Sequence, residues 1–598
     1  PFGGNVVGLE AASWRYFNKS PQRLTWAEAS MMAVLPNAPS ITHVNKNRPR
    51  LLAKRDRLLQ KLLEKGSIDQ LDYEAALLEP LPSTLYALPN EAPHYLELLR
   101  KEEDGRIYTS HIEPTIQNQS AQVLNDFYPF WKAKKIYNAG ALILETKTGN
   151  VVAYHGNIPI TSEETWVDMV QAPRSSGSIL KPLLYAHQID EGLISPVQLA
   201  IDIPTYISGF NPTNYHKSFS GAIPIDEALQ QSLNVPAVRQ LQQYGVSKFL
   251  TRLRKHGLTT LNNSSDHYGL SLILGGGEVT LWDLANVYQR LGAQLVEDRD
   301  DDLLTTAAIF QTFEALKGLA RPDESGNWQV MDSRFPVAWK TGTSYGHRDA
   351  WAIGVTPSYT IATWVGNADG EGRDGIVGVG TAGKLLFTLF DIMPQEDNWF
   401  SAPYEDMSYF TICKESGYLT SVICPDTIQL LLPNQVERTK VCPYHYIHYT
   451  NEDETVRVDP SCVEHHELKQ TTYFQLPPEI STYYIPSHPE YKRLPPYATN
   501  CATDSSVPEM TFTYPLDGET IYLPKDLNNT DQQLIARIAH QQTETRLFWY
   551  LDDTYLGTTE LFHSMSIRPS PGQHTLLVED VKGNRTSRQF NVANRLHP

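Results

Sequence analysis

Three short motifs follow one another along the middle of the chain and constrain both its fold and its chemistry. They are Ser178-Ile-Leu-Lys181, Ser232-Leu-Asn234 and Lys340-Thr-Gly-Thr343. A Ser-x-x-Lys tetrapeptide alone carries little weight, because both residue types are common and a chain of this length should contain roughly one by chance. All three motifs in this order predict a fold that brings distant segments together at one groove.

The residues around Ser178 favour a reactive serine. A helix is predicted from Ser175 to Glu191, which places Lys181 one turn beyond Ser178 on the same face. The positive end of the helix dipole would favour negative charge near Ser178 during attack. A lysine that is desolvated beside a second cation can be neutral and act as a base, and Lys340 is the candidate second cation. The competing interpretation is an ordinary helix start with a solvated lysine.

The second motif supplies groups that would handle a peptide substrate. Ser232 and Asn234 lie in a helical stretch predicted from Ile223 to Tyr244, with an interruption at Pro236. In that position the hydroxyl would relay a proton to a leaving amine, and the amide would hold a substrate amide. Polar residues on an ordinary helix are the competing interpretation.

The third motif is predicted to end a strand. An exposed strand edge can pair with an extended peptide, while the hydroxyls of Thr341 and Thr343 meet a terminal carboxylate. Gly342 would let that backbone approach closely. A plain turn is the alternative, but this tetrapeptide is expected by chance far less than once in a chain of this length.

The segments around the motifs alternate between strand and helix patterns. Apolar runs at residues 140–144 and 151–154 flank the turn Lys147-Thr-Gly-Asn150 and predict a β-hairpin. Further strands are predicted at Phe335–Lys340, Ala350–Val355 and Tyr359–Val365. The sequence therefore predicts an α+β fold, with helices bracketed by one antiparallel sheet.

Both ends of the chain differ from this middle part. Helices are predicted at Val7–Phe17, Thr25–Leu35 and Arg50–Glu64. From Met510 onward, short β-rich runs alternate with turns at Asp517-Gly, Asp552-Asp and Lys582-Gly-Asn, as is typical of a small β-sandwich. At 598 residues the chain is too long for one core, so several domains are expected.

Composition argues against a nucleic-acid partner and a membrane span. The formal charge is −18, whereas phosphate binding needs a concentrated surplus of Lys and Arg. The sequence contains no stretch of about 18 apolar residues, and residues 1–10 lack the pattern of a signal peptide. Because the sequence begins with Pro1, we expect an anchoring segment to precede it in the full-length protein.

All 5 cysteines lie between Cys413 and Cys501, in a region rich in Pro and Tyr. Such clustering favours disulfides in an oxidising compartment, and the odd count leaves a thiol unpaired. The alternative is a four-ligand zinc site, because Cys442-Pro-Tyr-His445 and Cys462-Val-Glu-His465 repeat a Cys-x-x-His spacing. Disulfides are the favoured interpretation, so no metal site is predicted from this pattern.

Longer phrases around the motifs resemble the class A penicillin-binding proteins, most closely the 1C type. These phrases are Pro173–Pro182, Ala228–Val238, Lys340–Trp351 and, near the N-terminus, Leu24–Pro39. The resemblance implies a penicillin-binding, β-lactamase-like transpeptidase fold that cross-links peptidoglycan through an acyl-serine intermediate. Its substrates would be stem peptides ending in D-Ala-D-Ala, which β-lactams mimic, and no cofactor is implied.

Carried over position by position, the resemblance assigns a role to each motif residue. Three residues would be catalytic: Ser178 as nucleophile, Lys181 as its base and Ser232 as proton shuttle. Five would bind substrate: Asn234 through an amide, and Lys340, Thr341, Gly342 and Thr343 around its carboxylate. The backbone N–H groups of Ser178 and Thr343 would form the oxyanion hole.

The resemblance also implies an order of domains. Residues 1–85 would be the last part of a lysozyme-like glycosyltransferase domain, 86–135 a linker, 136–398 the transpeptidase domain, 399–505 a Cys/Pro-rich connector and 506–598 a C-terminal Ig-like β-sandwich. The glycosyltransferase's catalytic glutamates belong to motifs that this sequence lacks, and Glu28 lies in a structural helix phrase. We therefore expect no glycan polymerisation by this chain.

Location, partners and rival functions follow from the same resemblance. The expected location is the periplasmic face of the bacterial cytoplasmic membrane, with other cell-wall synthesis proteins as candidate partners. A DD-carboxypeptidase or β-lactamase-like hydrolase would share the acyl-serine step but deliver the acyl group to water. A degenerate penicillin-binding scaffold is the non-enzymatic rival, against which the intact Ser178, Lys181 and Lys340 count.

Overall fold

A computed structural model describes residues 2, 6–36, 47–88, 90–102, 108–158, 165–207, 210–322, 335–394, 398–459, 462–463, 468–499, 501, 508–523, 533–542 and 544–593. The chain divides into two compact units, Pro1–Leu96 and Glu97–Pro598. Within the described ranges, no helix combines the length and the apolar character that crossing a membrane requires.

The first unit is helical. Its helices are α1 (Leu9–Phe17), α2 (Trp26–Val34), α3 (Arg48–Glu64) and α4 (Gln70–Leu78), and α5 (Pro93–Glu102) begins at its end. The three helices predicted here are confirmed, and α4 was not predicted. Glu28 completes a capping box, since its carboxylate accepts from the backbone N–H of Thr25 while the Thr25 hydroxyl accepts from the N–H of Glu28. Glu28 also forms an ion pair with Lys19, so its contacts are structural.

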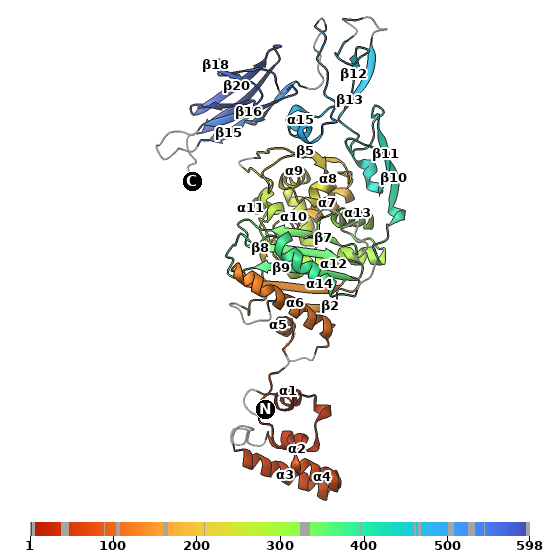
Figure 1. Ribbon diagram of the computed structural model, residues 1–598, viewed down its shortest axis with the longest axis vertical. Helices are drawn as coiled ribbons and strands as arrows, with labels where there is room; N and C mark the ends of the chain where they lie inside the picture. The colour runs from red at the N-terminus through yellow and green to blue at the C-terminus, as the bar shows by residue number, and fades with distance from the viewer. Residues whose placement is uncertain are drawn as a thin grey trace. The chain divides into compact units, whose positions relative to one another are not determined.

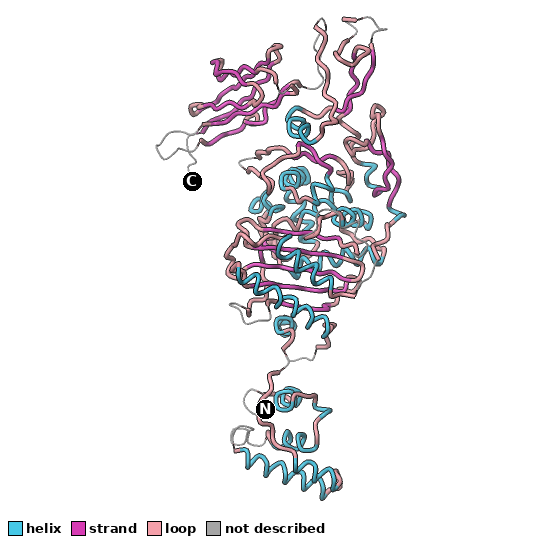
Figure 2. The backbone as a smooth tube through the Cα atoms, in the orientation of Figure 1, coloured by secondary structure: helices cyan, strands magenta, loops and turns pink. Residues whose placement is uncertain are grey.

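The centre of the second unit is an antiparallel five-stranded sheet in the order β2-β1-β9-β8-β7 (Figures 1 and 2). The strands are β1 (Asn138–Glu145), β2 (Val151–His155), β7 (Ala338–Thr343), β8 (Asp349–Val355) and β9 (Tyr359–Gly366). β1 and β2 form the predicted hairpin around the turn at residues 147–150. The predicted α+β class with an antiparallel sheet is confirmed. The strand that carries the third motif, β7, lies at the edge of this sheet.

Helices cover both faces of the sheet. They are α6 (Pro114–Ala133), α12 (Leu281–Glu297), α13 (Thr306–Lys317) and α14 (Lys384–Asp391). Adjacent strand residues face opposite sides. A Cβ at Gly354 of β8 would meet Phe390 of α14, whereas the side chain of the next residue, Val355, approaches Gly292 of α12. The sheet is thus a buried middle layer, with α14 and α6 on one face and α12 on the other.

The segment between β2 and β7 folds into helices and short ribbons that carry the first two motifs. Its elements are β3 (Arg174–Ser175), α7 (Lys181–Asp190), β4 (Leu199–Asp202), β5 (Gly221–Pro224), α8 (Ile225–Gln230), α9 (Asn234–Tyr244), α10 (Val246–Lys255), α11 (Ser265–Tyr268), η2 (Gly269–Leu274) and β6 (Glu278–Val279). β3 pairs with β6, and β4 pairs with β5.

Two helix predictions in this segment are wrong in extent. The helix predicted from Ser175 begins only at Lys181, because Arg174 and Ser175 pair as strand β3 and Gly177 adopts a positive φ of 54°. The helix predicted over Ile223–Tyr244 is two helices, α8 and α9, separated at residues 231–233. The break lies before Pro236, which occupies the first turn of α9, where a proline is tolerated.

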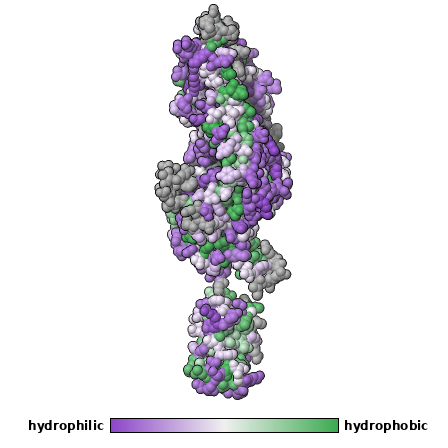
Figure 3. Space-filling view, turned by 90° about the vertical axis from the view of Figure 1, so that its right-hand side faces the viewer, coloured by the Kyte–Doolittle hydropathy of each residue, from purple (hydrophilic) through white to green (hydrophobic). Residues whose placement is uncertain are grey.

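A connector follows the sheet and consists mainly of two small hairpins and one helix. Its elements are β10 (Met407–Cys413), β11 (Thr427–Pro433), β12 (His445–Thr450), β13 (Lys469–Phe474) and α15 (Pro478–Tyr484). β10 pairs with β11, and β12 pairs with β13. The face of the protein on which β10 and β11 lie is largely hydrophilic, with narrow hydrophobic strips (Figure 3). One disulfide, Cys462–Cys501, lies in this region.

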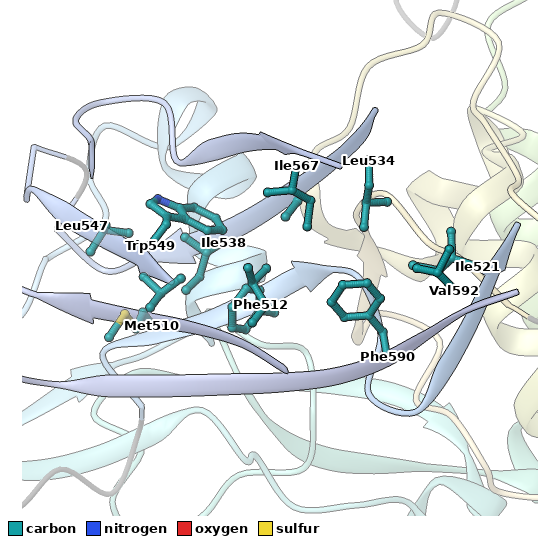
Figure 4. Close-up of a cluster of buried hydrophobic side chains, with 13 residues drawn as sticks. Met510, Phe512, Ile521, Leu534, Ile538, Leu547, Trp549, Ile567, Phe590 and Val592 are labelled. Carbon is teal, nitrogen blue, oxygen red and sulfur yellow. The ribbon is translucent and has the colours of Figure 1, made fainter. Parts of the chain in front are cut away.

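The last part of the chain is the predicted β-sandwich, which is confirmed. One sheet has the order β14-β16-β19 and the other β15-β21-β20-β17-β18. The strands are β14 (Met510–Tyr514), β15 (Glu519–Tyr522), β16 (Leu534–His540), β17 (Leu547–Leu551), β18 (Thr554–Thr559), β19 (Ser564–Ile567), β20 (Gly572–Asp580) and β21 (Arg585–Ala593). Alternating residues of the two sheets meet in a buried core that includes Phe512, Trp549 and Phe590 (Figure 4).

Trp549→Ala is expected to lower the free energy of unfolding of this sandwich by about 3–5 kcal/mol. The Trp549 side chain is fully buried, its indole N–H donates to the Thr559 hydroxyl at 2.8 Å, and its ring packs edge-to-face against Phe512. Urea titration with hydrogen exchange of peptides from β14–β21 measures the change. Trp166→Ala is the control, because Trp166 is 83% exposed; a loss below about 1 kcal/mol at Trp549 would contradict the packing argument.

Candidate active site

The three motifs meet through the side chains of two buried lysines. Lys340 of β7 donates from Nζ to the Ser232 hydroxyl and to the carbonyl of Thr341, both at 2.8 Å. Lys181, the first residue of α7, donates from Nζ to the carbonyl of Ser232 at 2.8 Å, to the carbonyl of Leu233 at 3.0 Å and to Asn234 Oδ1 at 2.8 Å. Ser232 therefore bridges the two lysines, one through its hydroxyl and one through its carbonyl.

Burial controls the charge of both lysines. Desolvation and the nearby charge of Lys340 hold the pKa of Lys181 well below its ordinary value of 10.5. Desolvation alone lowers the pKa of Lys340 to about 7. The three acceptors around Lys181 Nζ favour its charged form. The neutral amine has only two N–H groups, so it keeps at most two of these contacts while its lone pair is available to accept a proton. The pair thus combines reduced basicity with fixed positions.

Ser178 lies in the tight turn that leads into α7, where the backbone N–H of Lys181 donates to the Ser178 carbonyl at 3.3 Å. The preceding residue, Gly177, has a φ of 54°, and a Cβ there would lie 2.7 Å from the backbone N and O of Thr343. A Cβ at Gly342 would lie 2.8 Å from the Ser176 carbonyl. These two glycines let the Ser178 turn and the end of β7 pack backbone to backbone.

Ser232 occupies a constrained turn between α8 and α9. Its φ of 55° lies in the left-handed region, which is uncommon for a residue with a side chain. The turn is fixed by Asn214, whose Oδ1 accepts from the backbone N–H groups of Asn234 and Val235 and so caps α9. Asn214 Nδ2 donates in turn to Asp202 Oδ1 at 2.7 Å. A strained turn held by a buried polar network is typical of a functional site.

A cavity of about 360 Å³ opens beside these groups. Its walls come from the three motifs, from the loop between β4 and β5, and from residues after β9: Ser178, Asp202, Asn214, Tyr215, His216, Ser218, Ser220, Gln231, Ser232, Leu233, Asn234, Thr341, Thr343, Val377 and Val379. The hydroxyl of Thr343 accepts from the backbone N–H of Gly378 at 2.9 Å. The cavity therefore runs along β7, the edge strand of the sheet.

All eight residues singled out in the sequence lie at or next to this cavity. Five line it: Ser178, Ser232, Asn234, Thr341 and Thr343. Lys181 and Lys340 are buried, and both donate hydrogen bonds to Ser232, which lines the cavity. Gly342 does not line the cavity, and a Cβ there would meet the Ser176 carbonyl. The close backbone approach that Gly342 permits is therefore to the Ser178 turn of the same chain, and not to a peptide substrate as predicted.

Sequence reasoning missed the part of the cavity wall that comes from the end of β4 and the loop after it. Asp202, Asn214, Tyr215 and His216 contribute to it, and Tyr215 is 70% exposed. Asn and Asp are common loop residues and helix caps, so the only available signal was the clustering of polar residues at 212–220. The fact that Asn214 caps a helix 20 positions further on appears only in three dimensions.

Comparison with known families gives three matches in the order that the sequence predicts. The model described as "Penicillin binding protein transpeptidase domain" matches residues 139–379, which contain all three motifs. "Transglycosylase" matches residues 1–63, and "Penicillin-Binding Protein C-terminus Family" matches residues 499–590. The chain belongs to the class A penicillin-binding proteins. It contains the transpeptidase domain together with only part of a transglycosylase domain.

Individual relatives agree with this family. The chain is 33% identical over 409 residues to penicillin-binding protein 1C of Escherichia coli, covering 66% of this chain and 52% of the relative. It is 28% identical over 507 residues to penicillin-binding protein 1A of Clostridium botulinum, covering 73% and 59% respectively. The chain thus spans between half and three fifths of the length of these curated relatives.

A solved structure agrees with the fold. The crystal structure of penicillin-binding protein 1A from Haemophilus influenzae superposes with a TM-score of 0.51 at 17% identity. The match covers 73% of this chain and 89% of that structure.

Proposed function

We propose that this chain cross-links peptidoglycan as a serine DD-transpeptidase, with the cavity along β7 as its active site. The observation that carries this proposal is the hydrogen-bonded chain Lys340–Ser232–Lys181 beside Ser178, at one cavity. Such a site pairs a hydroxyl nucleophile with a base of lowered pKa, which is the requirement for acyl transfer. Stem peptides ending in D-Ala-D-Ala are the proposed substrates, and β-lactams the proposed inhibitors.

In the acylation step, Ser178 Oγ attacks the carbonyl carbon of the penultimate D-Ala. A carbon–oxygen bond forms, and the hydroxyl proton passes to the neutral amine of Lys181. The bond to the last D-Ala then breaks, and its nitrogen receives the proton that Lys181 took up, by way of the Ser232 hydroxyl, which accepts a hydrogen bond from Lys340. The backbone N–H groups of Ser178 and Thr343 are proposed to hold the oxyanion, a contribution of about 3–4 kcal/mol per donor.

The edge of β7 is proposed to bind the substrate as an added strand. β7 pairs with β8 on one side, and its other side faces the cavity. We propose that the hydroxyls of Thr341 and Thr343, together with the positive charge of Lys340, bind the terminal carboxylate. Asn234 donates to the Thr213 carbonyl and accepts from Lys181, so we propose that its second Nδ2 hydrogen donates to a substrate amide.

Transfer to an amine distinguishes this function from the hydrolytic alternative. The acyl-enzyme should be attacked by an amine of a second stem peptide, which releases Ser178 and forms an amide. Purified chain incubated with a D-Ala-D-Ala peptide and an amine acceptor should release D-alanine and form the amide product, both measured by mass spectrometry. Release of D-alanine with the hydrolysed peptide as the only other product would instead indicate a carboxypeptidase, and no release would indicate a scaffold.

We propose the periplasmic face of the bacterial cytoplasmic membrane as the site of action, because the proposed substrate is assembled there. Other cell-wall synthesis proteins are candidate partners. The C-terminal sandwich contacts α15 of the connector through β14 and β16.

A further inference from the structure

Three cysteines and one histidine of the connector meet at a point remote in sequence from the three motifs. Cys413, Cys424, Cys442 and His445 each present one ligand atom, and these four atoms lie within 4.8 Å of one another. The Nδ1 atom of His445 is 3.6 Å from Cys413 Sγ, 3.5 Å from Cys424 Sγ and 3.3 Å from Cys442 Sγ. A single nitrogen is thus nearly equidistant from three sulfurs.

We propose that these four residues bind one structural zinc ion. Zinc bonds of about 2.3 Å to sulfur and about 2.0–2.1 Å to nitrogen, at tetrahedral angles, separate a nitrogen from a sulfur by about 3.6 Å. The three measured distances lie close to this value. Three thiolates with one imidazole are a donor set that favours zinc, and four protein ligands leave no open position for catalysis.

The surroundings of the four residues match those of a metal site. The other ring nitrogen of His445, Nε2, lies 2.8 Å from the Glu415 carboxylate, which fixes the tautomer that turns Nδ1 toward the sulfurs. The Ser416 hydroxyl donates to Cys442 Sγ at 3.1 Å, and the backbone N–H of Ser421 donates to Cys424 Sγ at 3.3 Å. Such bonds to sulfur stabilise thiolates.

The site would reinforce the small hydrophobic cluster beside β10 and β11. Cys413 ends β10, Cys424 precedes β11, and Cys442 and His445 bracket the start of β12, so one ion would join both hairpins. An isolated two-stranded hairpin is marginal in water. Among the described residues, the apolar cluster beside the site has three buried members, Ile412, Leu432 and Val436. The ion would add to the stability that this small cluster gives the hairpins.

The loop between β10 and β11, which contains Ser416 and Gly417, also joins the connector to the transpeptidase domain. The Ser416 carbonyl accepts from the backbone N–H of Leu199 at 2.9 Å, and Leu199 begins β4. A Cβ at Gly417 would collide with the Val197 carbonyl, so this turn packs directly on the backbone that leads into β4. Asp202, at the other end of β4, lines the cavity. The proposed ion therefore stabilises the loop that packs against β4, and β4 contributes Asp202 to the cavity wall.

A disulfide is the competing use of these thiols, as the sequence suggested. Cys462, which was paired with Cys442 in the zinc alternative of the sequence, is bonded to Cys501, and His465 lies outside the described residues. Cys413, Cys424 and Cys442 are unbonded, and an odd number of thiols cannot all pair. A disulfide between two of them would not explain why His445 Nδ1 lies close to all three sulfurs.

The experiment is metal analysis of the chain purified without chelator, with thiol titration of the denatured, chelated protein. We expect about one zinc per chain and three titratable thiols. Cys442→Ser and Cys413→Ser should reduce zinc to background, whereas the Cys462→Ser/Cys501→Ser double variant should retain it. Absence of zinc overturns the proposal, whether one thiol or three are titrated, and so does retention of zinc in both single variants.

Two further measurements keep the proposal falsifiable if the cysteine variants do not fold. Cobalt exchanged into the wild-type chain should give the visible absorption of a tetrahedral thiolate site; a spectrum typical of octahedral cobalt would overturn the proposal. Glu415→Gln keeps all four ligands but weakens the bond that orients His445, so its zinc affinity should fall about 10–100-fold in competition with a chelator. An unchanged affinity would contradict the assigned geometry.

Discussion

Ser178→Ala is expected to abolish covalent attachment of a fluorescent penicillin. The β-lactam carbonyl needs a hydroxyl that lies in the cavity and next to a base of lowered pKa. Ser178 meets both conditions, because it lines the cavity and lies at the turn that begins α7 with Lys181. Ser232 also lines the cavity, but its hydroxyl is held by Lys340. Gel fluorescence after incubation with the probe measures the loss.

The matched control is Ser176→Ala in the same turn. The Ser176 side chain is fully buried, and its hydroxyl has no hydrogen-bond partner among the described residues, so its removal should leave labelling unchanged. Peptide mapping of the labelled wild-type chain should place the adduct on Ser178. Labelling that persists in Ser178→Ala, or an adduct mapped to Ser232, would show that the nucleophile is another residue.

The fold was predictable where local pattern and tertiary structure agree. The β1–β2 hairpin is an example, because its apolar runs and the turn at Lys147–Asn150 are contiguous in sequence. In the sandwich, the predicted turn at Asp552-Asp joins β17 to β18, with both residues at positive φ. Helix boundaries were less predictable. The start of α7 depends on the pairing of Arg174 and Ser175 with β6, about a hundred residues away.

The site was predictable in composition but not in geometry. The motifs identify Ser178, Lys181 and Lys340, but not that Ser232 lies in a left-handed turn held by Asn214. Long-range contacts of this kind leave no local signature. The cysteine cluster is a similar case, since the Cys-x-x-His spacing marks Cys442 and His445 but does not identify the two cysteines that join them.

Lys181→Ala is expected to slow acylation by a β-lactam by about 10²–10⁴-fold, the usual contribution of a general base. Lys181 is nearly fully buried, and its Nζ contacts the carbonyl of Ser232 and the side chain of Asn234. Stopped-flow or quenched-flow measurement of adduct formation gives the rate. Lys147→Ala is the control, because Lys147 is exposed in the β1–β2 turn and should not affect it. A loss of less than about 10-fold would assign the base elsewhere.

The pH dependence of the acylation rate tests whether Lys181 acts as a base, because a purely structural role of Lys181 would not produce it. Only neutral Lys181 can take the Ser178 proton, so the rate should rise with pH as Lys181 deprotonates, at a pH well below 10.5 because burial and Lys340 lower the Lys181 pKa. Lys340→Met removes the second positive charge, which favours protonated Lys181 and raises its pKa. The acid limb should therefore move to higher pH in Lys340→Met, and a limb that stays in place or moves to lower pH would contradict the coupling between the two lysines.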